Sequence, residues 1–427
     1  MKTLVAFPST AIFGQEAARA FDEVGGLEAY FTSFAHCRSG PLARILPVVP
    51  RGRSILTQLE RRAITALPDD KIETRPLLEI LYTAAASGGA RTRTVDRIWD
   101  YLSKDFTRAA ARRIARGGVG AVYAYEYSAL EAFEAADRLG IAKILDFPSL
   151  NSRQFETLQR AQKEIYPELR TPDDAYFEAL FETRQARRDA EMRAADVIIT
   201  NSSLTRASHI AGGADPKKTF AVPYGAPAPL EAVTAAPDPH GPLRVIWAGT
   251  FSIRKAAHLF AEAWRGNMDP AHARADIFGA IGLPDRLWKP APEGMTFHGS
   301  VVRPVLFDAF QASDVLMFPT LSDGFGMVVT EAFARGLPVI TTDQAGASDL
   351  VRHGVNGLII EAGNAQAIAD ALCWCLDNRT ALAGMREAAL ETARGWQWSE
   401  YRSALRGAVA EGLRRCGQET DPQDWRN

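Results

Sequence analysis

The stretch FPTLSDGFGMVVTEAFARGLPVITT, residues 318–342, contains the densest pattern in the chain. Its apolar start predicts a strand that ends at Phe318, and a loop with two glycines follows. A helix is expected to begin near Met327, and the run LPVIT at 337–341 predicts the next strand. Strand, loop, helix and strand in this order form the repeating unit of a parallel α/β sheet.

The same alternation extends outward through the whole chain. Strands are predicted at 2–7, 27–33, 119–125, 141–147, 196–200 and 219–223, and again at 243–248, 274–279, 314–318, 337–341 and 355–360. Between the two series lies PYGAPAPLEAVTAAPDPHGP, residues 223–242, whose six prolines exclude a regular element and indicate a linker. The sequence therefore predicts two doubly wound, Rossmann-like domains with a cleft between the carboxyl ends of their sheets.

Composition excludes several classes of protein. The chain has 427 residues and a formal net charge of -2, so nothing draws it toward nucleic acid. Its four cysteines lack zinc-binding spacing, and Cys373 and Cys375 are expected to be buried thiols in a reducing, cytoplasmic setting. The start of the chain favours a buried strand over a signal peptide, and no run of about 18 apolar residues predicts a membrane span.

The loop after Phe318 has the chemistry of a ligand site. Asp323 in the loop and Glu331 in the following helix can both face the cleft and accept hydrogen bonds from sugar hydroxyls. Glycines let a backbone approach a ligand closely, and helix N-termini bind phosphate. The backbone groups expected at this site belong to Gly324, Phe325, Gly326, Met327 and Val328. The alternative is a tight turn with a solvated acid at each end.

A second motif is AGTFSIRKAAHLFAEAW, residues 248–264, in which Gly249 opens a turn. Arg254 and Lys255 stand where a helix is expected to begin, and cations are unfavourable there unless an anion joins them. A diphosphate would supply that anion; otherwise the two residues are solvated surface cations. Gly279 is expected to end a strand at the same crevice.

Asp146 is a further candidate because it ends the apolar run IAKIL, and Pro148 stops that strand soon afterwards. A carboxylate at the carboxyl end of a parallel strand is expected at the mouth of the cleft. There it could accept a proton or hydrogen bond from a reacting hydroxyl, or stabilise positive charge. The alternative is a capping role toward backbone N–H groups of the next loop.

Taken in order, several segments resemble the family 4 retaining glycosyltransferases, which are group 1 glycosyl transferases of GT-B fold. The resemblance is close over about 195–400 and loose before it. It rests on ADVIITNSS, the Arg254-Lys255 pair, the stretch from His298 to Pro319, the Asp323 and Glu331 spacing, and RHGVNGLII. The last segment, 396–416, resembles the helix that crosses back to the first domain.

This resemblance implies an acceptor domain at 1–225, completed by a helix at about 400–420, and a donor domain at 226–399. It implies a metal-independent hexosyltransferase without cofactor. The reaction would move a sugar, with retention, from a nucleotide-diphosphate sugar to a hydroxyl of a glycan, lipid or small molecule. UDP- and GDP-sugars are the favoured donors, and polysaccharide biosynthesis is a fitting setting.

The resemblance also implies residue roles. Arg254 and Lys255 would hold the donor diphosphate, Glu331 the ribose and Asp323 the donor sugar. Two departures stand out: Asp323 replaces the usual Glu, and Asp146 stands near the place of a histidine that many relatives carry. A GT-B epimerase, a phosphorylase and a non-catalytic sugar-nucleotide-binding protein therefore stay as alternatives.

Two basic stretches in the first domain indicate contact with anionic lipid headgroups as one option and solvated helix faces as the other. Residues 38–62 hold six arginines, and residues 91–116 hold eight Arg and Lys. The expected location is cytoplasmic, with the inner membrane face as a peripheral docking place.

Overall fold

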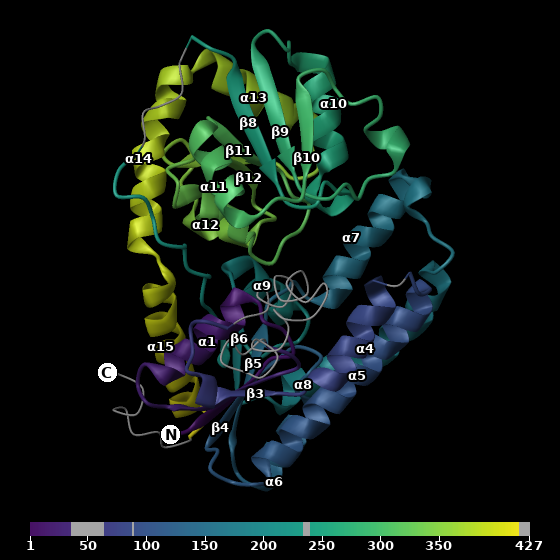
Figure 1. Ribbon diagram of the computed structural model, residues 1–427, viewed down its shortest axis with the longest axis vertical. Helices are drawn as coiled ribbons and strands as arrows, with labels where there is room; N and C mark the ends of the chain where they lie inside the picture. Colours follow the sequence, from purple (N-terminus) through teal and green to yellow (C-terminus); the bar gives the residue numbers. More distant parts are fainter. Residues whose placement is uncertain (36–63, 88, 234–239, 418–427) are drawn as a thin grey trace, which may run out of the picture.

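A computed structural model describes residues 1–35, 64–87, 89–233 and 240–417. Two parallel sheets lie one above the other, each covered on both faces by helices (Figure 1). The first sheet has the strand order β3-β2-β1-β4-β5-β6-β7 and the second β10-β9-β8-β11-β12-β13. In both, the order reverses beside the first strand of the unit, which is the doubly wound arrangement expected from the sequence.

The strands agree closely with the predicted apolar runs. Those of the first sheet are β1 (Thr3–Ala6), β2 (Leu27–Thr32), β3 (Ile72–Thr74), β4 (Ala121–Tyr125), β5 (Ala142–Phe147), β6 (Val197–Thr200) and β7 (Thr219–Ala221). Those of the second are β8 (Leu243–Ala248), β9 (Ala273–Phe278), β10 (Met295–Gly299), β11 (Val315–Phe318), β12 (Val339–Thr342) and β13 (Gly357–Ile360). Two edge strands, β3 and β10, lie outside the predicted strand ranges. The β3 sequence Ile-Glu-Thr carries only one apolar residue, and β10, Met-Thr-Phe-His-Gly, carries two.

Alternate residues of each strand enter two separate cores. In the first sheet, one face packs on α1 (Ile12–Asp22) and α15 (Trp398–Arg415). The opposite face packs on α5 (Thr92–Ile114), α6 (Leu130–Arg138) and α8 (Asp174–Ala194). Burial on both faces explains why these strands are continuous apolar runs in the sequence. α4 (Pro76–Ser87) adds to the side of α5.

The second sheet is covered in the same way. α10 (Ala257–Asn267) and α13 (Ala365–Asp377) pack on one face. The other face receives α11 (Arg303–Ala312), α12 (Met327–Phe333) and α14 (Arg379–Gly395). α7 (Ser152–Ile165) and α9 (Ser203–Ala211) belong to the first half, and α7 reaches up beside the second sheet (Figure 1).

Two predicted helices have different geometry. The expected helix at 253–264 begins as a 3₁₀ turn over Ile253–Lys255, and α10 starts only after Ala256. Ala256 has φ 58, a left-handed conformation that breaks the hydrogen-bond ladder between the two pieces. The strand–helix alternation also predicts a helix at 346–353, after the strand at 337–341, and the structure has a shorter 3₁₀ helix there, Gly346–Leu350. Both short turns lie at the carboxyl ends of strands, where they shape the cleft.

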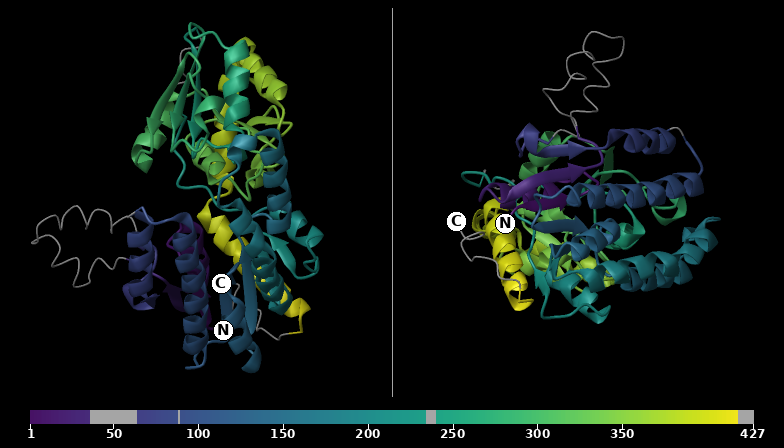
Figure 2. Two further views of the ribbon diagram at one scale, coloured as in Figure 1. Left: turned by 90° about the vertical axis from the view of Figure 1, so that its right-hand side faces the viewer. Right: turned by 90° about the horizontal axis from the view of Figure 1, so that it is seen from below.

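The end of the chain returns to the first sheet, as predicted (Figure 2). α15 begins with a capping box between Gln397 and Glu400 and then packs along α1 and β6. Arg402 forms ion pairs with Glu16 and Glu23 of the α1 region. The domain boundaries at 225/226 and 399/400 stay predictions. Within the described residues, no helix is both long and apolar enough to cross a membrane.

Candidate active site

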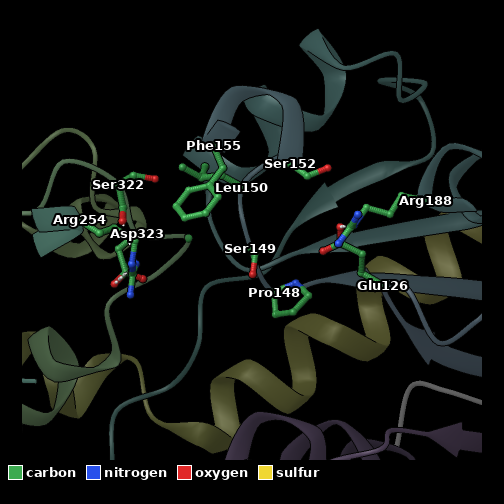
Figure 3. A pocket seen from close by; sticks show the side chains of 11 residues that line it. Glu126, Pro148, Ser149, Leu150, Ser152, Phe155, Arg188, Arg254, Ser322 and Asp323 are labelled. Atoms are coloured by element: carbon green, nitrogen blue, oxygen red, sulfur yellow. Dashed lines mark hydrogen bonds and ion pairs between the residues drawn. The ribbon is translucent and has the colours of Figure 1, made fainter. Parts of the chain in front are cut away.

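A cavity of about 400 Å³ lies between the carboxyl ends of the two sheets (Figure 3). The first half and the second half of the chain each contribute one wall. Its lining residues are Glu126, Pro148, Ser149, Leu150, Ser152, Phe155, Arg188, Arg254, Ser322, Asp323 and Gly324. Three of the predicted site residues, Arg254, Asp323 and Gly324, therefore line one cavity.

Arg254, Lys255 and Asp323 form one charged cluster. The Lys255 ammonium contacts the Asp323 carboxylate directly and lies 4.2 Å from the centre of the Phe318 ring. Arg254 donates from Nη1 to Ser322 O at 2.9 Å and lies 3.4 Å from Asp323 Oδ2. Lys255 is nearly buried, whereas the Arg254 side chain is 45% exposed. Both cations therefore lie beside Asp323, and their role at a donor diphosphate stays a prediction.

Burial and neighbouring charges shift the pKa of both Asp323 and Lys255. Burial opposes the charged form of Asp323, but Lys255, Arg254 and the Phe325 N–H outweigh it, so its pKa lies below the ordinary value. Burial lowers the pKa of Lys255, and the Asp323 charge partly offsets that shift. A buried ammonium held by one carboxylate has spare donors, which is what a second anion requires.

Three glycines, Gly249, Gly279 and Gly299, lie at the carboxyl ends of neighbouring strands of the second sheet, and we call them the glycine edge. Gly249 N donates to Phe278 O, and Gly279 N donates to Gly299 O. Gly249 and Gly279 have φ of 122 and 137, and a Cβ on Gly279 would lie 2.1 Å from Gly249 O. Only glycine fits at that contact. A ligand at this edge would meet backbone rather than side chains, which agrees with the sequence-based choice of both residues.

The glycine-rich loop is held by the other half of the chain. Gly324 O accepts hydrogen bonds from Ser202 Oγ at 2.7 Å and from Thr205 Oγ1 at 2.9 Å. Asp349 binds the backbone N–H and hydroxyl of Ser203 at the start of α9. Phe325 is buried and packs edge-on against Tyr224. These contacts fix the loop relative to the first sheet.

Glu331 lies away from the charged cluster. It accepts a hydrogen bond from Arg303 Nη2 at 2.5 Å, at the start of α11. Burial raises the pKa of Glu331, while Arg303 opposes this shift. Met327 and Val328, in the first turn of α12, are partly buried against the hydrophobic core that includes Phe325. The two predicted acids therefore belong to different ion pairs, and only Asp323 lines the cavity.

The opposite wall contains residues that sequence reasoning missed. Glu126 directly follows β4, and Arg188 lies on α8, with 2.7 Å between Arg188 Nε and Glu126 Oε1. Burial raises the pKa of Glu126, while Arg188 opposes this shift. Ser152 begins α7 nearby and bonds to Gln185. The sequence signal for Glu126 was the presence of an acid directly after a predicted strand. The sequence carried no comparable signal for Arg188.

The predicted position of Asp146 at the cleft mouth is wrong. Its side chain is 1% exposed and lies in the core, where Tyr123 donates to Oδ2 at 2.5 Å. Its other oxygen, Oδ1, has no hydrogen-bond partner among the described residues, so Asp146 caps no backbone N–H group there either. Burial raises the pKa of Asp146 to about 7, against the lowering effect of the Tyr123 hydroxyl that donates to it.

We therefore expect Asp146→Asn to change stability with pH rather than catalysis. An ordinary Asp in the unfolded chain has a pKa near 3.9. Because the folded value is raised to about 7, the folded state binds more protons between these values, and the free energy of unfolding falls as pH rises through that window. Asparagine does not titrate. The free energy of unfolding of Asp146→Asn minus that of wild type should therefore increase by about 2–3 kcal/mol from pH 5 to pH 8.

Urea unfolding at several pH values measures this difference. Parallel stability curves for wild type and Asp146→Asn would contradict the buried-acid interpretation. A turnover that falls by orders of magnitude at unchanged melting temperature would instead support a catalytic role.

The described part of the chain contains no cluster of three or more His, Cys, Asp or Glu side chains suited to a metal ion. Metal independence stays a prediction. Cys375 is buried as expected, whereas Cys373 is only partly buried.

Comparison with known proteins supports the resemblance. The family model for glycosyl transferases group 1 matches residues 242–378, about a third of the chain. We call this matched part the group 1 domain. It contains the glycine edge, the charged cluster and Glu331, so the resemblance seen in the sequence is confirmed at family level. The finer assignment to family 4 is consistent with this match.

Two curated relatives are D-inositol 3-phosphate glycosyltransferases. The protein of Nocardia farcinica is 35% identical over 184 residues, 40% of each chain. That of Catenulispora acidiphila is 27% identical over 253 residues, 52% of this chain and 60% of the relative. The chain thus matches less than two thirds of the length of these relatives.

Solved structures extend the likeness to the whole fold. The sucrose-phosphate synthase of Thermosynechococcus elongatus has a TM-score of 0.65 at 15% identity, over 97% of this chain and 100% of that one. Anabaena HepE in complex with UDP-glucose has a TM-score of 0.59 at 17% identity, over 96% and 99%. The group 1 domain and the first sheet together therefore form a GT-B fold.

Proposed function

We propose that this protein is a retaining, metal-independent glycosyltransferase that moves a hexose from a nucleotide-diphosphate sugar to an acceptor hydroxyl. The observation that carries the proposal is the Arg254, Lys255 and Asp323 cluster at the mouth of the group 1 domain. The names of the curated relatives and the UDP-glucose bound to Anabaena HepE support this class of donor.

The donor would bind by exchanging partners within the cluster. Its diphosphate would take the spare donors of Lys255 and the exposed guanidinium of Arg254, and Asp323 would then turn toward the sugar hydroxyls. As the leaving diphosphate gains charge, fixed cations in a site shielded from water stabilise it more than they stabilise the bound substrate. No bound metal is needed for this part of the chemistry.

The geometry favours transfer over the alternatives for one reason. The cavity continues past the donor cluster to a second wall with its own charged groups, Glu126 and Arg188, and this leaves space for an acceptor. An epimerase needs no space for an acceptor, whereas a phosphorylase would fill this space with the glycoside that it cleaves, so the product of the reaction must separate a phosphorylase from a transferase. The acceptor type, the finer choice between UDP and GDP, and a cytoplasmic location are parts of the proposal.

A donor panel tests the proposal directly. Purified protein is incubated with UDP-, GDP- and ADP-sugars in EDTA, with and without a mixture of acceptor sugars, and the anomer of the product is determined by NMR. We expect one nucleotide class to bind and a product that retains the donor configuration. Inversion, a need for divalent metal, or an epimerised donor as the product would each contradict part of the proposal.

The ribose role of Glu331 gives a separate prediction. Glu331→Gln should weaken binding of the free nucleoside diphosphate by about 10-fold or more, because a charged hydrogen-bond acceptor contributes about 1.5–3 kcal/mol. Calorimetric titration measures the Kd. Glu262→Gln, an exposed acid on α10, is the matched control. Equal affinity of wild type and Glu331→Gln would remove the ribose assignment.

Membrane contact is a weaker part of the proposal. The basic stretch 38–62 lies outside the described residues. In the stretch 91–116, Arg93, Lys104 and Arg113 form ion pairs with acids of the same chain. Such pairing reduces the charge available to a lipid surface, and vesicle flotation with anionic lipids would measure what remains.

A further inference from the structure

The wall opposite the donor cluster has a charged pair that the donor chemistry leaves unused. Glu126 and Arg188, the wall pair, face the cavity across Ser149 from Arg254 and Asp323 (Figure 3). The pair joins two elements that are distant in sequence, the end of β4 and the middle of α8. Its side chains are 13% and 20% exposed, so solvent screens it only in part.

The backbone next to this pair is held in an unfavourable conformation. Tyr127 has φ 67, which is rare for a residue that is not glycine. Buried Glu191 fixes the loop by accepting hydrogen bonds from the N–H groups of Tyr127, Ala129 and Leu130 at 2.6, 3.0 and 3.1 Å. Strain of this kind costs about 1–3 kcal/mol and is concentrated at ligand sites. The hydrogen bonds to Glu191 therefore hold the backbone next to Glu126 in this conformation, and this indicates that Glu126 has a role at a ligand site.

The wall pair also has unused hydrogen-bonding capacity. Arg188 directs its Nε at Glu126 Oε1, 2.7 Å away, and its two Nη groups form no hydrogen bond to another described residue. Its guanidinium lies 4.8 Å from the centre of the Tyr127 ring, which holds it in place. One acceptor and several N–H donors side by side match two neighbouring hydroxyls, because each hydroxyl both donates and accepts.

We propose that Glu126 and Arg188 bind two adjacent hydroxyls of the acceptor, and that this acceptor is an uncharged polyhydroxylated ring. This rests on the proposed glycosyltransferase function and names its second substrate class. The residues that line the cavity carry two acids, Glu126 and Asp323, and two guanidinium groups, Arg188 and Arg254. The further positive charge, on Lys255 beside Asp323, is the one that the proposed function assigns to the donor diphosphate.

Balanced charge gives no surplus attraction for an anionic acceptor. A phosphate at Arg188 would have to displace the Glu126 carboxylate, which would leave a partly buried acid without its cation. The remaining lining fits the ring of a sugar or cyclitol, because Leu150 and Phe155 offer apolar surface to its C–H face. Bound donor would engage Arg254, so selection of the acceptor would depend on the wall pair.

Saturation-transfer NMR tests this without turnover. Wild type, saturated with the nucleoside diphosphate that it binds, is titrated with a panel of neutral monosaccharides and cyclitols and with their phosphate esters. We expect a neutral polyol to bind, and Glu126→Gln and Arg188→Lys each to weaken it 10-fold or more. Nucleotide affinity should stay within 2-fold. Arg188→Lys keeps the charge but loses the planar fork.

The control is Glu182→Gln, which removes an exposed acid from the same helix as Arg188 and should change nothing. Melting temperatures identify a variant that has lost its fold, and the second variant then decides. Equal polyol affinity in wild type and both variants would overturn the proposal. So would preference for a phosphate ester whose binding survives Glu126→Gln. Failure of every nucleotide to bind wild type would instead refute the proposed function.

Discussion

Lys255→Met is expected to reduce sugar transfer by about 100- to 1,000-fold while the fold remains intact. The ammonium lies nearly buried between Asp323 and the Phe318 ring, so its charge acts with little screening by solvent. Removing one fixed donor from a site of developing negative charge typically has an effect of this size. Methionine fills a similar volume, so the packing against Phe318 is largely kept.

Steady-state transfer and calorimetric binding of the nucleoside diphosphate measure the effect together. We expect both turnover and nucleotide affinity to fall, since Lys255 would contact the diphosphate before and during transfer. Lys289→Met, at a half-exposed lysine paired with Asp285, is the control. Turnover within 10-fold of wild type would remove Lys255 from the diphosphate site, and with it the main support for the proposed function.

Gly326→Ala is expected to lower the free energy of unfolding by about 2–4 kcal/mol. Gly326 has φ 91, and a Cβ there would lie 2.6 Å from Cε1 of Phe318. The left-handed conformation costs a residue with a Cβ about 1–2 kcal/mol, and overpacking against a buried ring adds a similar amount. Because Gly326 caps α12, relief of the clash would also displace the loop that carries Asp323.

Chemical denaturation gives the change in stability, and transfer assays give the accompanying loss of turnover. The matched control is Gly384→Ala in α14, where the new Cβ meets nothing within 4 Å. That control should be neutral or stabilising by up to about 1 kcal/mol, since alanine favours a helix over glycine. Similar stability changes in the two variants would contradict the tight packing of the loop.

The sequence by itself determined most strands of the two sheets and the candidate donor-site residues of the second half of the chain. Strands buried on both faces must be continuous apolar runs, and so their order could be read directly from the chain. Arg254, Lys255 and Asp323 were selected because each lies in the segment directly after a strand, and Glu331 because it lies in the helix that follows Asp323. The separation of Asp323 from Glu331 into different ion pairs was not visible in that spacing.

Only the tertiary structure decided the other wall. Asp146 is paired with Tyr125 in the β5–β4 register, so its side chain turns into the core under α1 and α15. The cleft begins just beyond the strand ends, at Glu126 and Pro148. The position of a strand end predicts the edge of the sheet that borders the cleft. It does not predict which of two successive residues faces the cleft, because side chains alternate along a strand. The partner of Glu126 is Arg188, on a helix that only folding brings to that edge.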